Sequence, residues 1–328
     1  MAIASNTPVP TPDGWVNAIN LRIGDLVYTS EGTPQTLRVV QDYIPTICYR
    51  VTFDDGLSLI TDGKQVLEVQ DPKWRQRYAA WHKSNRLKPK TSKKRLRRPM
   101  KTITVKDLAG QPLMSTDKKR STYTVATTKP IQYPSVDLPV PPYVLGVWLF
   151  TKGKRHNWIA CDQFNIVQRK MRQHGFFITP GKQSRAKMIF EIRPSVKDSF
   201  LFMDANIPVT LPFYYVQSSI EQREQLLDAL MDVKRIKTDG NGITRDYFNR
   251  QWKECRKIQA IVESLGIKTN VYEDKKSFGY RVKYRVDPNS DVFPSRYVKK
   301  VEKIQPKQCV HLAADSKIVV GEGFIPIC

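Results

Sequence analysis

The first seventy residues carry short runs in which apolar and polar side chains alternate, a pattern typical of half-buried β-strands. Three of these runs, Leu26–Thr29, Leu37–Val40 and Cys48–Phe53, are rich in β-branched and aromatic residues. Turn sequences separate them, including Glu31-Gly32 and Asp54-Asp55-Gly56. The pattern therefore predicts an N-terminal β region.

From residue 139 onward the pattern changes to alternating helices and strands, and it occurs twice. Helices are predicted to begin at Pro141-Pro142, where a missing N–H costs nothing, and at Ser218-Ser219-Ile220-Glu221, which reads as a capping box. A second helix follows each of them and ends at a glycine, with Phe164–His174 before Gly175 and Tyr247–Leu265 before Gly266. Strands are expected at Asn157–Cys161, Met188–Ile192, Thr269–Tyr272 and Gly279–Val286.

The last part of the chain returns to the β pattern, with strands predicted at Val301–Ile304, Val310–Leu312 and Ile318–Val320. A short helix is predicted at Val105–Leu108, before the α/β repeat that begins near residue 139. A β segment at each end of an α/β repeat suggests one β domain interrupted by an inserted domain. We therefore predict an α+β protein with domains at residues 1–125, 126–294 and 295–328.

Charge changes this picture, because the chain carries a formal net charge of +23 and has a pI near 9.8. Such a chain attracts polyanions and releases counterions on binding them. Thirteen Lys or Arg and no acid lie between Lys73 and Lys101, with Trp74, Tyr78 and Trp81 among the first of them. We interpret this basic insertion, residues 73–101, as a nucleic-acid contact carried by Lys73, Arg75, Arg77, Lys88, Lys90, Lys93, Lys94, Arg95, Arg97 and Arg98.

Other functional classes find little support in the sequence. The five cysteines are far apart and show no C-x-x-C spacing, so neither a disulfide framework nor a zinc site is indicated. None of the four histidines has a partner at helical spacing, and we expect no metal site and no cofactor. A phosphate-binding loop is absent, as are a secretory signal and an apolar run long enough to span a membrane.

Two helix-sized segments, Val144–Lys152 and Leu227–Arg235, carry one signature, VLGVWLFTK and LDALMDVKR. Both resemble the LAGLIDADG motif of homing endonucleases. The resemblance implies that Leu145–Leu149 packs against Leu226–Asp232 as a pair of helices. In that family the eighth position of each motif is an aspartate that holds the catalytic metal, and here it is Thr151 and Lys234.

Nearly the whole chain resembles an intein, in which a Hint-fold splicing domain is split in sequence around a LAGLIDADG endonuclease. The resemblance rests on the order and spacing of Thr7–Trp15, Val51–Gly56, the two signature helices and Gly321–Pro326. The run Leu138–Leu149 is similar to inteins of phage terminase large subunits. The intein resemblance implies a split all-β Hint-like domain that encloses a pseudo-two-fold LAGLIDADG α/β domain.

The positions that perform splicing in inteins hold other residues here. Ala2 stands where a Cys or Ser attacks the preceding carbonyl, and Lys64 or Gln65 stands where a His protonates the leaving amide. Ala313 stands where an Asp is expected, and Cys328 stands in the His position with no Asn after it. An artificial substitution would account for Ala2 and a shortened end for the missing Asn, but neither accounts for the internal losses. We expect no splicing.

The endonuclease positions suggest the same loss. Thr151 is a poor metal ligand, Lys234 places a positive charge where cations bind, and Asp232 occupies the sixth motif position, whose role is structural. Asp239 is a conceivable displaced ligand, but it has no counterpart in the first copy. Cations follow both helices and would hold DNA phosphates, namely Lys152, Lys154, Arg155, Lys234, Arg235 and Lys237.

The resemblance therefore implies a degenerate relative of inteins and homing endonucleases that binds double-stranded DNA without splicing or cleaving it. One alternative is an active homing endonuclease with Mg²⁺ on unorthodox ligands such as Asp232 or Asp239. Another is a phage structural or assembly protein that binds a terminase or virion protein. Met1 ahead of the Hint block suggests a free-standing product, in the cytoplasm of a phage-infected bacterium or in the virion.

Overall fold

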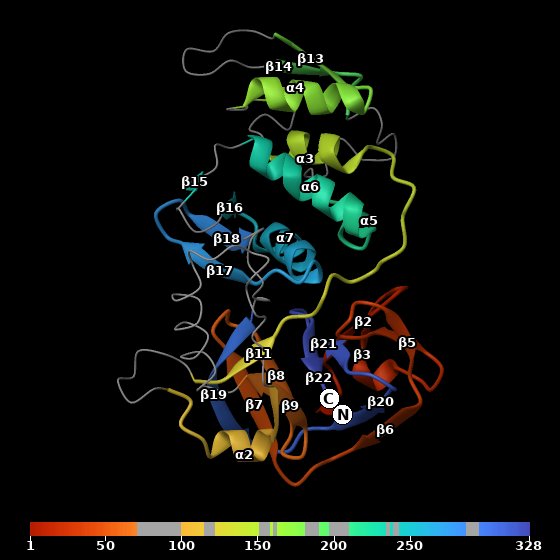
Figure 1. Ribbon diagram of the computed structural model, residues 1–328, viewed down its shortest axis with the longest axis vertical. Coiled ribbons are helices and arrows are strands. Elements are labelled where there is room, and N and C mark those ends of the chain that lie inside the picture. Colours follow the sequence, from red (N-terminus) through yellow and green to blue (C-terminus); the bar gives the residue numbers. More distant parts are fainter. Residues whose placement is uncertain are drawn as a thin grey trace, which may run out of the picture. The chain divides into compact units, whose positions relative to one another are not determined.

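The computed structural model describes residues 1–70, 100–114, 122–150, 158–159, 163–180, 190–196, 210–233, 237–238, 243–286 and 295–328. The chain forms two compact units (Figure 1). Unit 1 comprises Met1–Ile131 and Asp291–Cys328, and unit 2 comprises Gln132–Ser290. Unit 2 is thus inserted in sequence between the two parts of unit 1. Within the described ranges, no helix combines the length and the apolar character needed to cross a membrane.

Unit 1 consists mainly of antiparallel strands. Its first part contains η1 (Ala18–Asn20), α2 (Val105–Ala109) and the strands β1 (Ala2–Ala4), β2 (Pro8–Thr11), β3 (Gly14–Asn17), β4 (Leu26–Tyr28), β5 (Pro34–Thr36), β6 (Val39–Tyr43), β7 (Cys48–Phe53), β8 (Ser58–Asp62), β9 (Val66–Gln70), β10 (Met100–Thr104) and β11 (Thr124–Ala126). Its second part contains β19 (Ser295–Ile304), β20 (Cys309–Ala313), β21 (Ile318–Val320) and β22 (Ile325–Ile327). The expected strand at 48–53 and the expected short helix are confirmed.

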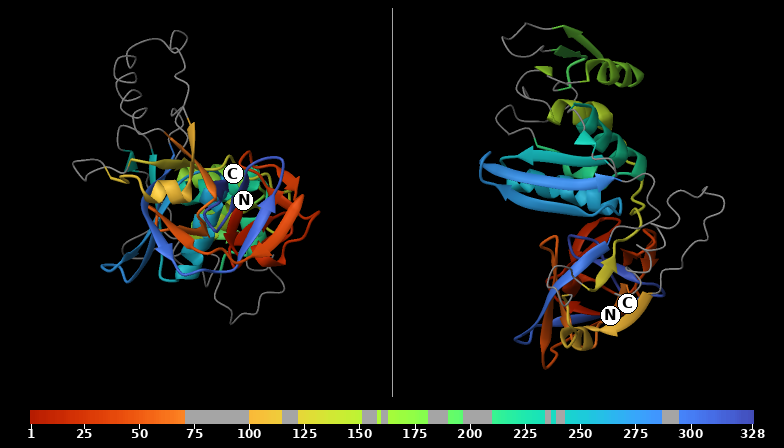
Figure 2. Two further views of the ribbon diagram at one scale, coloured as in Figure 1. Left: turned by 90° about the horizontal axis from the view of Figure 1, so that it is seen from below. Right: turned by 60° about the vertical axis from the view of Figure 1, so that its left-hand side comes forward.

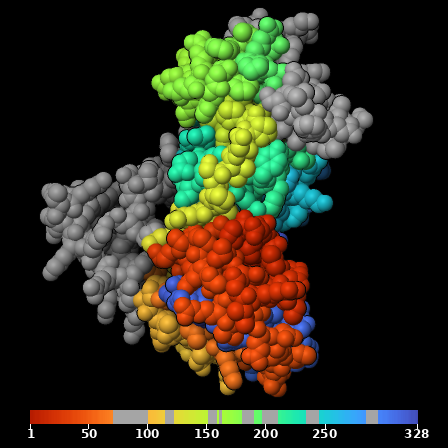
Figure 3. Space-filling view, turned by 90° about the vertical axis from the view of Figure 1, so that its right-hand side faces the viewer, coloured from red at the N-terminus to blue at the C-terminus, as the bar shows by residue number. Residues whose placement is uncertain are grey.

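The two sequence-distant parts of unit 1 share their sheets. One sheet has the order β1-β20-β6, and the larger one has the order β10-β9-β11-β19-β7-β8. C-terminal strands β20 and β19 therefore lie between N-terminal strands in both sheets, and the two ends of the chain lie side by side (Figure 2). On the surface, blue C-terminal residues are interleaved with red and orange N-terminal ones (Figure 3). Because each part completes the other's sheets, neither part has a complete fold by itself.

A buried ion pair also joins the two parts. Arg296 in β19 donates from Nε to Oδ2 of Asp55 over 2.6 Å, and their side chains are 2% and 0% exposed. Asp55 belongs to the turn between β7 and β8, where its other carboxylate oxygen accepts from the N–H of Leu57. The turn that the sequence predicted at Asp54-Asp55-Gly56 therefore also anchors the C-terminal part of the chain.

Two predictions about unit 1 need correction. Leu37 was expected inside a strand, but it lies between β5 and β6, where its backbone pairs with Asp25 and its side chain is fully buried. Residues 126–131, expected in the inserted domain, belong to unit 1, because Lys129 N–H donates to the carbonyl of Ser30 and Ile131 is buried. In both places tertiary contacts override local periodicity.

Unit 2 contains two successive α/β halves. The first comprises α3 (Pro142–Phe150), β12 (Trp158–Ile159), α4 (Phe164–Gln173), β13 (Phe177–Pro180) and β14 (Phe190–Arg193). The second comprises α5 (Phe213–Val216), α6 (Ile220–Val233), β15 (Lys237–Thr238), β16 (Ile243–Asn249), α7 (Trp252–Ser264), β17 (Thr269–Asp274) and β18 (Gly279–Val286). Their sheets have the orders β12-β14-β13 and β15-β16-β18-β17. The halves correspond through α3 and α6, β12 and β16, α4 and α7, β13 and β17, and β14 and β18.

The glycine stops show how closely the two halves correspond. Gly175 and Gly266 end α4 and α7 with φ values of 77° and 76°, a left-handed conformation that favours glycine. After each, the next N–H bonds back into the helix, from Phe176 to Met171 and from Ile267 to Val262. The repeat inferred from the sequence is thus present in the backbone.

Helices α3 and α6 pack tightly against each other, as the signature predicted. A β-carbon on Gly146 would lie 2.6 Å from Cβ of Ala229 and 2.9 Å from the carbonyl oxygen of Leu226. The glycine therefore permits a crossing that no larger residue would allow. At the start of α6 the capping box forms one residue later than expected, because Ser219 Oγ accepts from Gln222 N–H while Gln222 Oε1 accepts from Ser219 N–H.

The predicted helix Tyr247–Leu265 is wrong in its first part. Residues up to Asn249 continue strand β16, with Tyr247 opposite Val282 and Asn249 opposite Tyr280 in β18. The side chain of Asn249 then accepts from the N–H of Gln251 and ends the strand, and α7 begins at Trp252. Helical spacing of apolar residues cannot reveal a strand partner that lies more than thirty residues further along the chain.

Candidate functional site

The peptide between Met1 and Ala2 is held inside unit 1. Strand β1 pairs with β20, so Ala2 lies opposite His311 and is 4% exposed. The Met1 carbonyl accepts from Leu312 N–H, and the Met1 amine donates to the Leu312 carbonyl over 2.9 Å. Burial lowers the pKa of that amine, although nearby Asp62 opposes the shift. These contacts fix the backbone on both sides of Ala2.

Gln65 is the side chain that holds the Ala2 amide. Its Oε1 accepts from Ala2 N–H over 2.6 Å, and its Nε2 donates to the carbonyls of Val66 and Cys328 over 2.7 and 2.8 Å. The residue is 3% exposed, so these partners fix the orientation of its amide group. Lys64 is exposed. Of the two candidates from the sequence, the structure therefore brings Gln65 to this peptide.

A second set of side chains lies around Ala2 and Gln65, and the sequence did not reveal it. The hydroxyl of Thr61 donates to the Ala2 carbonyl. Asp62 accepts from Gln65 N–H over 2.8 Å and from the Tyr43 hydroxyl. Burial first, and then the Asp62 carboxylate, raises the pKa of Tyr43. Thr61 and Asp62 lie four and three residues before Gln65, a pattern too short to identify a site. Only the fold brings Thr61 to Ala2 and Asp62 to Tyr43 of β6.

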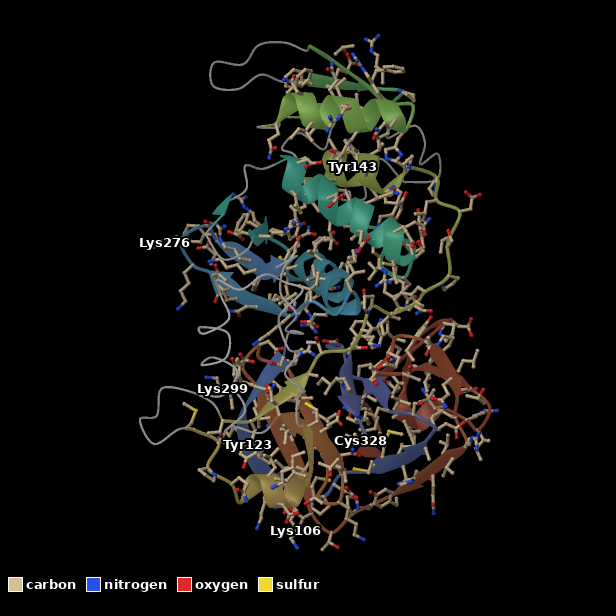
Figure 4. The ribbon with its side chains drawn as sticks, in the orientation of Figure 1. Lys106, Tyr123, Tyr143, Lys276, Lys299 and Cys328 are labelled. Atoms are coloured by element: carbon tan, nitrogen blue, oxygen red, sulfur yellow. The ribbon has the colours of Figure 1, made fainter. Side chains whose placement is uncertain are left out.

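His311 is exposed on β20 opposite Ala2. Partial burial of its ring, together with the nearby Met1 amine, lowers the pKa of His311. Ala313 closes β20 opposite Val39 and carries no polar side-chain atom. Cys328 lies among the strands of unit 1 (Figure 4), with its N–H directed to the Val66 carbonyl, and burial raises the pKa of its thiol.

This arrangement can hold a peptide but lacks two chemical groups for cleaving it. The methyl group of Ala2 cannot attack the Met1 carbonyl, and the amide of Gln65 does not titrate near neutral pH and cannot supply a proton as an acid. Thr61 instead donates to the Ala2 carbonyl, and Asp62 accepts from the backbone N–H of Gln65. Both polar backbone groups of the Met1–Ala2 peptide are hydrogen-bonded, the Met1 carbonyl to Leu312 N–H and the Ala2 N–H to Gln65 Oε1.

Two buried thiols meet nearby, although the sequence gave no sign of a pair. Cys48 Sγ lies 3.9 Å from Cys309 Sγ, and burial raises the pKa of Cys309 to about 12. Both are free thiols, as are Cys255 and Cys328. In the described part of the chain, no group of three or more His, Cys, Asp or Glu side chains is arranged to bind a metal.

In unit 2, the predicted metal-ligand positions lie just beyond the described ends of the two signature helices. Thr151, Lys234 and Asp239 are outside the described residues. Asp232 is described and is only 8% exposed. Its Oδ2 accepts from the Tyr143 hydroxyl over 2.9 Å and pairs with Lys170 Nζ over 2.8 Å. The carboxylate therefore joins α6 to α3 and α4, in keeping with a structural role.

Most of the predicted DNA contacts also fall outside the described residues. This applies to the tract Lys73, Arg75, Arg77, Lys88, Lys90, Lys93, Lys94, Arg95, Arg97 and Arg98, and to Lys152, Lys154, Arg155 and Arg235. Lys237 lies in β15, but its side chain is not described.

The four-stranded sheet of unit 2 carries cations that were not among the predicted DNA contacts. Arg281 in β18 pairs with Asp274 and Asp246 over 2.5 and 2.6 Å and lies over the ring of Phe248. Two residues further along the strand, Lys283 lies over the ring of Tyr272. Alternation places Arg281 and Lys283 on one face of the sheet, while Val282, between them, is fully buried in the core.

The chain resembles known proteins over only part of its length or of theirs. No protein-family model matches the chain. The chain is 24% identical to the replicative DNA helicase DnaB of Mycobacterium intracellulare over 267 residues, which is 81% of this chain and 42% of that protein. The chain thus spans about two-fifths of the length of this curated relative.

Similar solved structures include intein splicing domains. The MchDnaB-1 intein is 28% identical, with a TM-score of 0.20 and coverage of 20% of this chain and 52% of that one. The Msm DnaB1 intein splicing domain bound with zinc is also 28% identical, with a TM-score of 0.20 and coverage of 20% and 54%. The gp41-1 intein is 25% identical, with a TM-score of 0.19 and coverage of 20% and 51%.

Proposed function

We propose that this chain is an intein relative in which unit 1 no longer splices and unit 2, a LAGLIDADG-like domain, binds double-stranded DNA without cleaving it. The discontinuous β unit around an inserted, internally repeated α/β unit supports this assignment. The helix pair α3 and α6 supports the LAGLIDADG part. The chain lacks a phosphate-binding loop, so a helicase activity is not carried over from the DnaB relative.

One observation carries the proposal: the N–H of Ala2 is held by the side chain of Gln65, which also holds the Cys328 carbonyl. These are three of the positions at which the intein resemblance expects splicing residues. The fold brings them together although they are remote in sequence. A coincidental β protein has no reason to bring these three positions together. The residues present can bind the peptide but cannot supply the nucleophile or the acid.

Thiol-induced cleavage tests the splicing half of the proposal. A reporter domain fused ahead of Met1 is released by dithiothreitol only if residue 2 forms a thioester with the Met1 carbonyl. The unchanged chain and Ala2→Cys alone should release little reporter, whereas Ala2→Cys with Gln65→His should release it. Ala2→Cys with Lys64→His is the matched control, because Lys64 is exposed. Thiol-dependent release from the unchanged chain would refute the loss of splicing.

Support for DNA binding comes from charge, both the net +23 and the cations on the sheet of unit 2. Affinity for a short duplex should fall steeply as salt rises, and Arg95→Ala, Arg97→Ala and Arg98→Ala together should weaken it and flatten the salt slope. Replacing exposed Lys106, Lys300 and Lys303 of unit 1 with Ala gives a control of equal charge change. No binding at low salt would favour a protein partner instead.

Absence of cleavage is tested on plasmid DNA with Mg²⁺ or Mn²⁺. The role of Asp232 in joining three helices favours an inactive site over the alternative of an active nuclease with unorthodox ligands. Linear plasmid that disappears in Asp232→Asn, in a protein that remains folded, would reverse this conclusion.

A further inference from the structure

The turn between β17 and β18 exposes a large aromatic side chain at a strained position. Phe278 is 84% exposed, and its φ of 51° lies in the left-handed region that side-chain-bearing residues avoid. Glycine or asparagine would occupy this position at lower cost. An exposed phenylalanine gains no burial in return, so the folded state of this chain by itself does not explain the residue.

The turn that carries Phe278 is held in one conformation. Asp274 Oδ1 accepts from the N–H groups of Lys276 and Ser277 over 3.1 and 3.3 Å, and Asp274 Oδ2 pairs with Arg281. After the turn, a β-carbon on Gly279 would lie 2.8 Å from the Asn249 carbonyl oxygen and from the Phe248 ring. The aromatic ring therefore projects from a fixed support, with little conformational entropy left for the backbone to lose on binding.

Cations and a second exposed aromatic ring surround the turn. Trp252 is 43% exposed, and its ring packs 5.0 Å from that of Tyr280 and lies beneath Arg256. Since Tyr280 pairs with both Glu273 and Asn249, these elements meet at one end of the sheet. The exposed charges there are Arg250, Lys253, Lys275, Lys276 and a single carboxylate, Glu273. Figure 4 shows Lys276 at the end of the hairpin.

We propose that Phe278 is a stacking wedge for an unpaired or unstacked base of duplex DNA, flanked by Lys275 and Lys276 on the neighbouring phosphates. The inference rests on the proposed DNA binding of unit 2 and adds a preferred substrate class, DNA with a locally opened or kinked step. Apolar side chains that enter a duplex between base steps need a rigid support and nearby cations, and both are present here. A protein partner would pair the four cations with acids, and that is a separate outcome of the test.

The test compares the affinity for two duplexes that are identical except for a single unpaired 2-aminopurine in the second. Fluorescence anisotropy at fixed salt gives the ratio of the two affinities, and quenching of 2-aminopurine reports stacking on the wedge. The unchanged protein should bind the second duplex more tightly. Phe278→Asn, which suits the left-handed backbone, should lower that affinity about fivefold or more and leave the affinity for intact duplex nearly unchanged. Phe278→Trp, which keeps an aromatic ring, should retain both the affinity ratio and the quenching of the unchanged protein.

Phe213→Ala is the matched control, because Phe213 is 52% exposed in α5, outside the hairpin, and should leave the ratio unchanged. A ratio near one for the unchanged protein, or equal losses on both duplexes in Phe278→Asn, would overturn the wedge while leaving DNA binding intact. Failure to bind either duplex would refute the proposed DNA binding itself and the wedge with it. Binding of an acidic protein that Phe278→Asn abolishes, without any effect on the ratio, would likewise assign the surface to a protein partner.

Discussion

Gly146 of α3 faces Ala229 of α6 so closely that a β-carbon on the glycine would lie 2.6 Å from that of the alanine. The two residues occupy the same position in the two copies of the signature. The helix pair at the centre of unit 2 therefore depends on the absence of one methyl group.

Gly146→Ala should lower the free energy of unfolding of unit 2 by about 1–3 kcal/mol, after a helix-propensity gain of up to about 1 kcal/mol. Urea denaturation monitored by tryptophan fluorescence measures the change. Adding Ala229→Gly should recover only part of the loss, because the Leu226 carbonyl oxygen remains 2.9 Å away. Gly110→Ala is the control, since its nearest neighbouring atom is 3.5 Å away. Equal stability of Gly146→Ala and the unchanged chain would contradict the close crossing.

Breaking the buried pair between Asp55 and Arg296 should destabilise unit 1. Asp55→Asn removes the carboxylate that pairs with the buried Arg296 guanidinium, so we expect a loss of about 3–5 kcal/mol. The double variant with Arg296→Met should lose less than the sum of the two single variants in a double-mutant cycle. Arg38 and Asp315 form the exposed comparison pair, at 68% and 52%, where Arg38→Met should change stability by about 1 kcal/mol or less. Additive losses at the buried pair would argue against direct coupling.

The β17–β18 turn should lose order in acid. The Arg281 guanidinium, and after it the Ser277 hydroxyl, lowers the pKa of Asp274 from its ordinary 3.8 to about 2. A lowered folded-state pKa means that the stabilisation is complete above the unfolded-state pKa and is lost as pH falls from about 3.8 towards 2. The protection of the Lys276 and Ser277 amides from hydrogen exchange, relative to the unfolded chain at the same pH, should fall in that window, and Asp274→Asn should abolish this pH dependence. Added salt should weaken this partly accessible ion pair, and protection insensitive to both pH and salt would show that the pair does not hold the turn.

Phe278→Gly should leave unit 2 as stable as before or stabilise it by up to about 1 kcal/mol. Relief of the left-handed backbone contributes about 1–2 kcal/mol, and the greater freedom of glycine in the unfolded chain offsets part of it. Thermal unfolding measures the net change, with Val282→Ala in the adjacent strand as the contrasting core variant that should lose roughly 1–3 kcal/mol. A clear loss of stability in Phe278→Gly would mean that the ring has a packing role in the folded protein.

The sequence determined those features that depend on near neighbours. Phe164–Gln173 is helical because its apolar side chains repeat at helical spacing, and Gly175 and Gly266 end their helices because a left-handed residue is needed there. Residues Cys48–Phe53 and Gly279–Val286 form strands because β-branched and aromatic residues alternate between turn signals. The two signatures likewise predicted that α3 and α6 pack against each other. Each of these depends on local sterics or on a period that one element contains.

Only the tertiary structure decided which distant residues share a site. Lys64 and Gln65 were equivalent candidates in the sequence, and the turn between β8 and β9 placed Gln65 inside, on the Ala2 amide, and Lys64 in solvent. Thr61, Asp62 and Tyr43 joined the site through β8 and β6, and Tyr247–Asn249 became a strand because β18 provided a partner. Side chains alternate between the two faces of a strand, so pairing with a distant strand decides both where a residue points and which polar atoms it must satisfy.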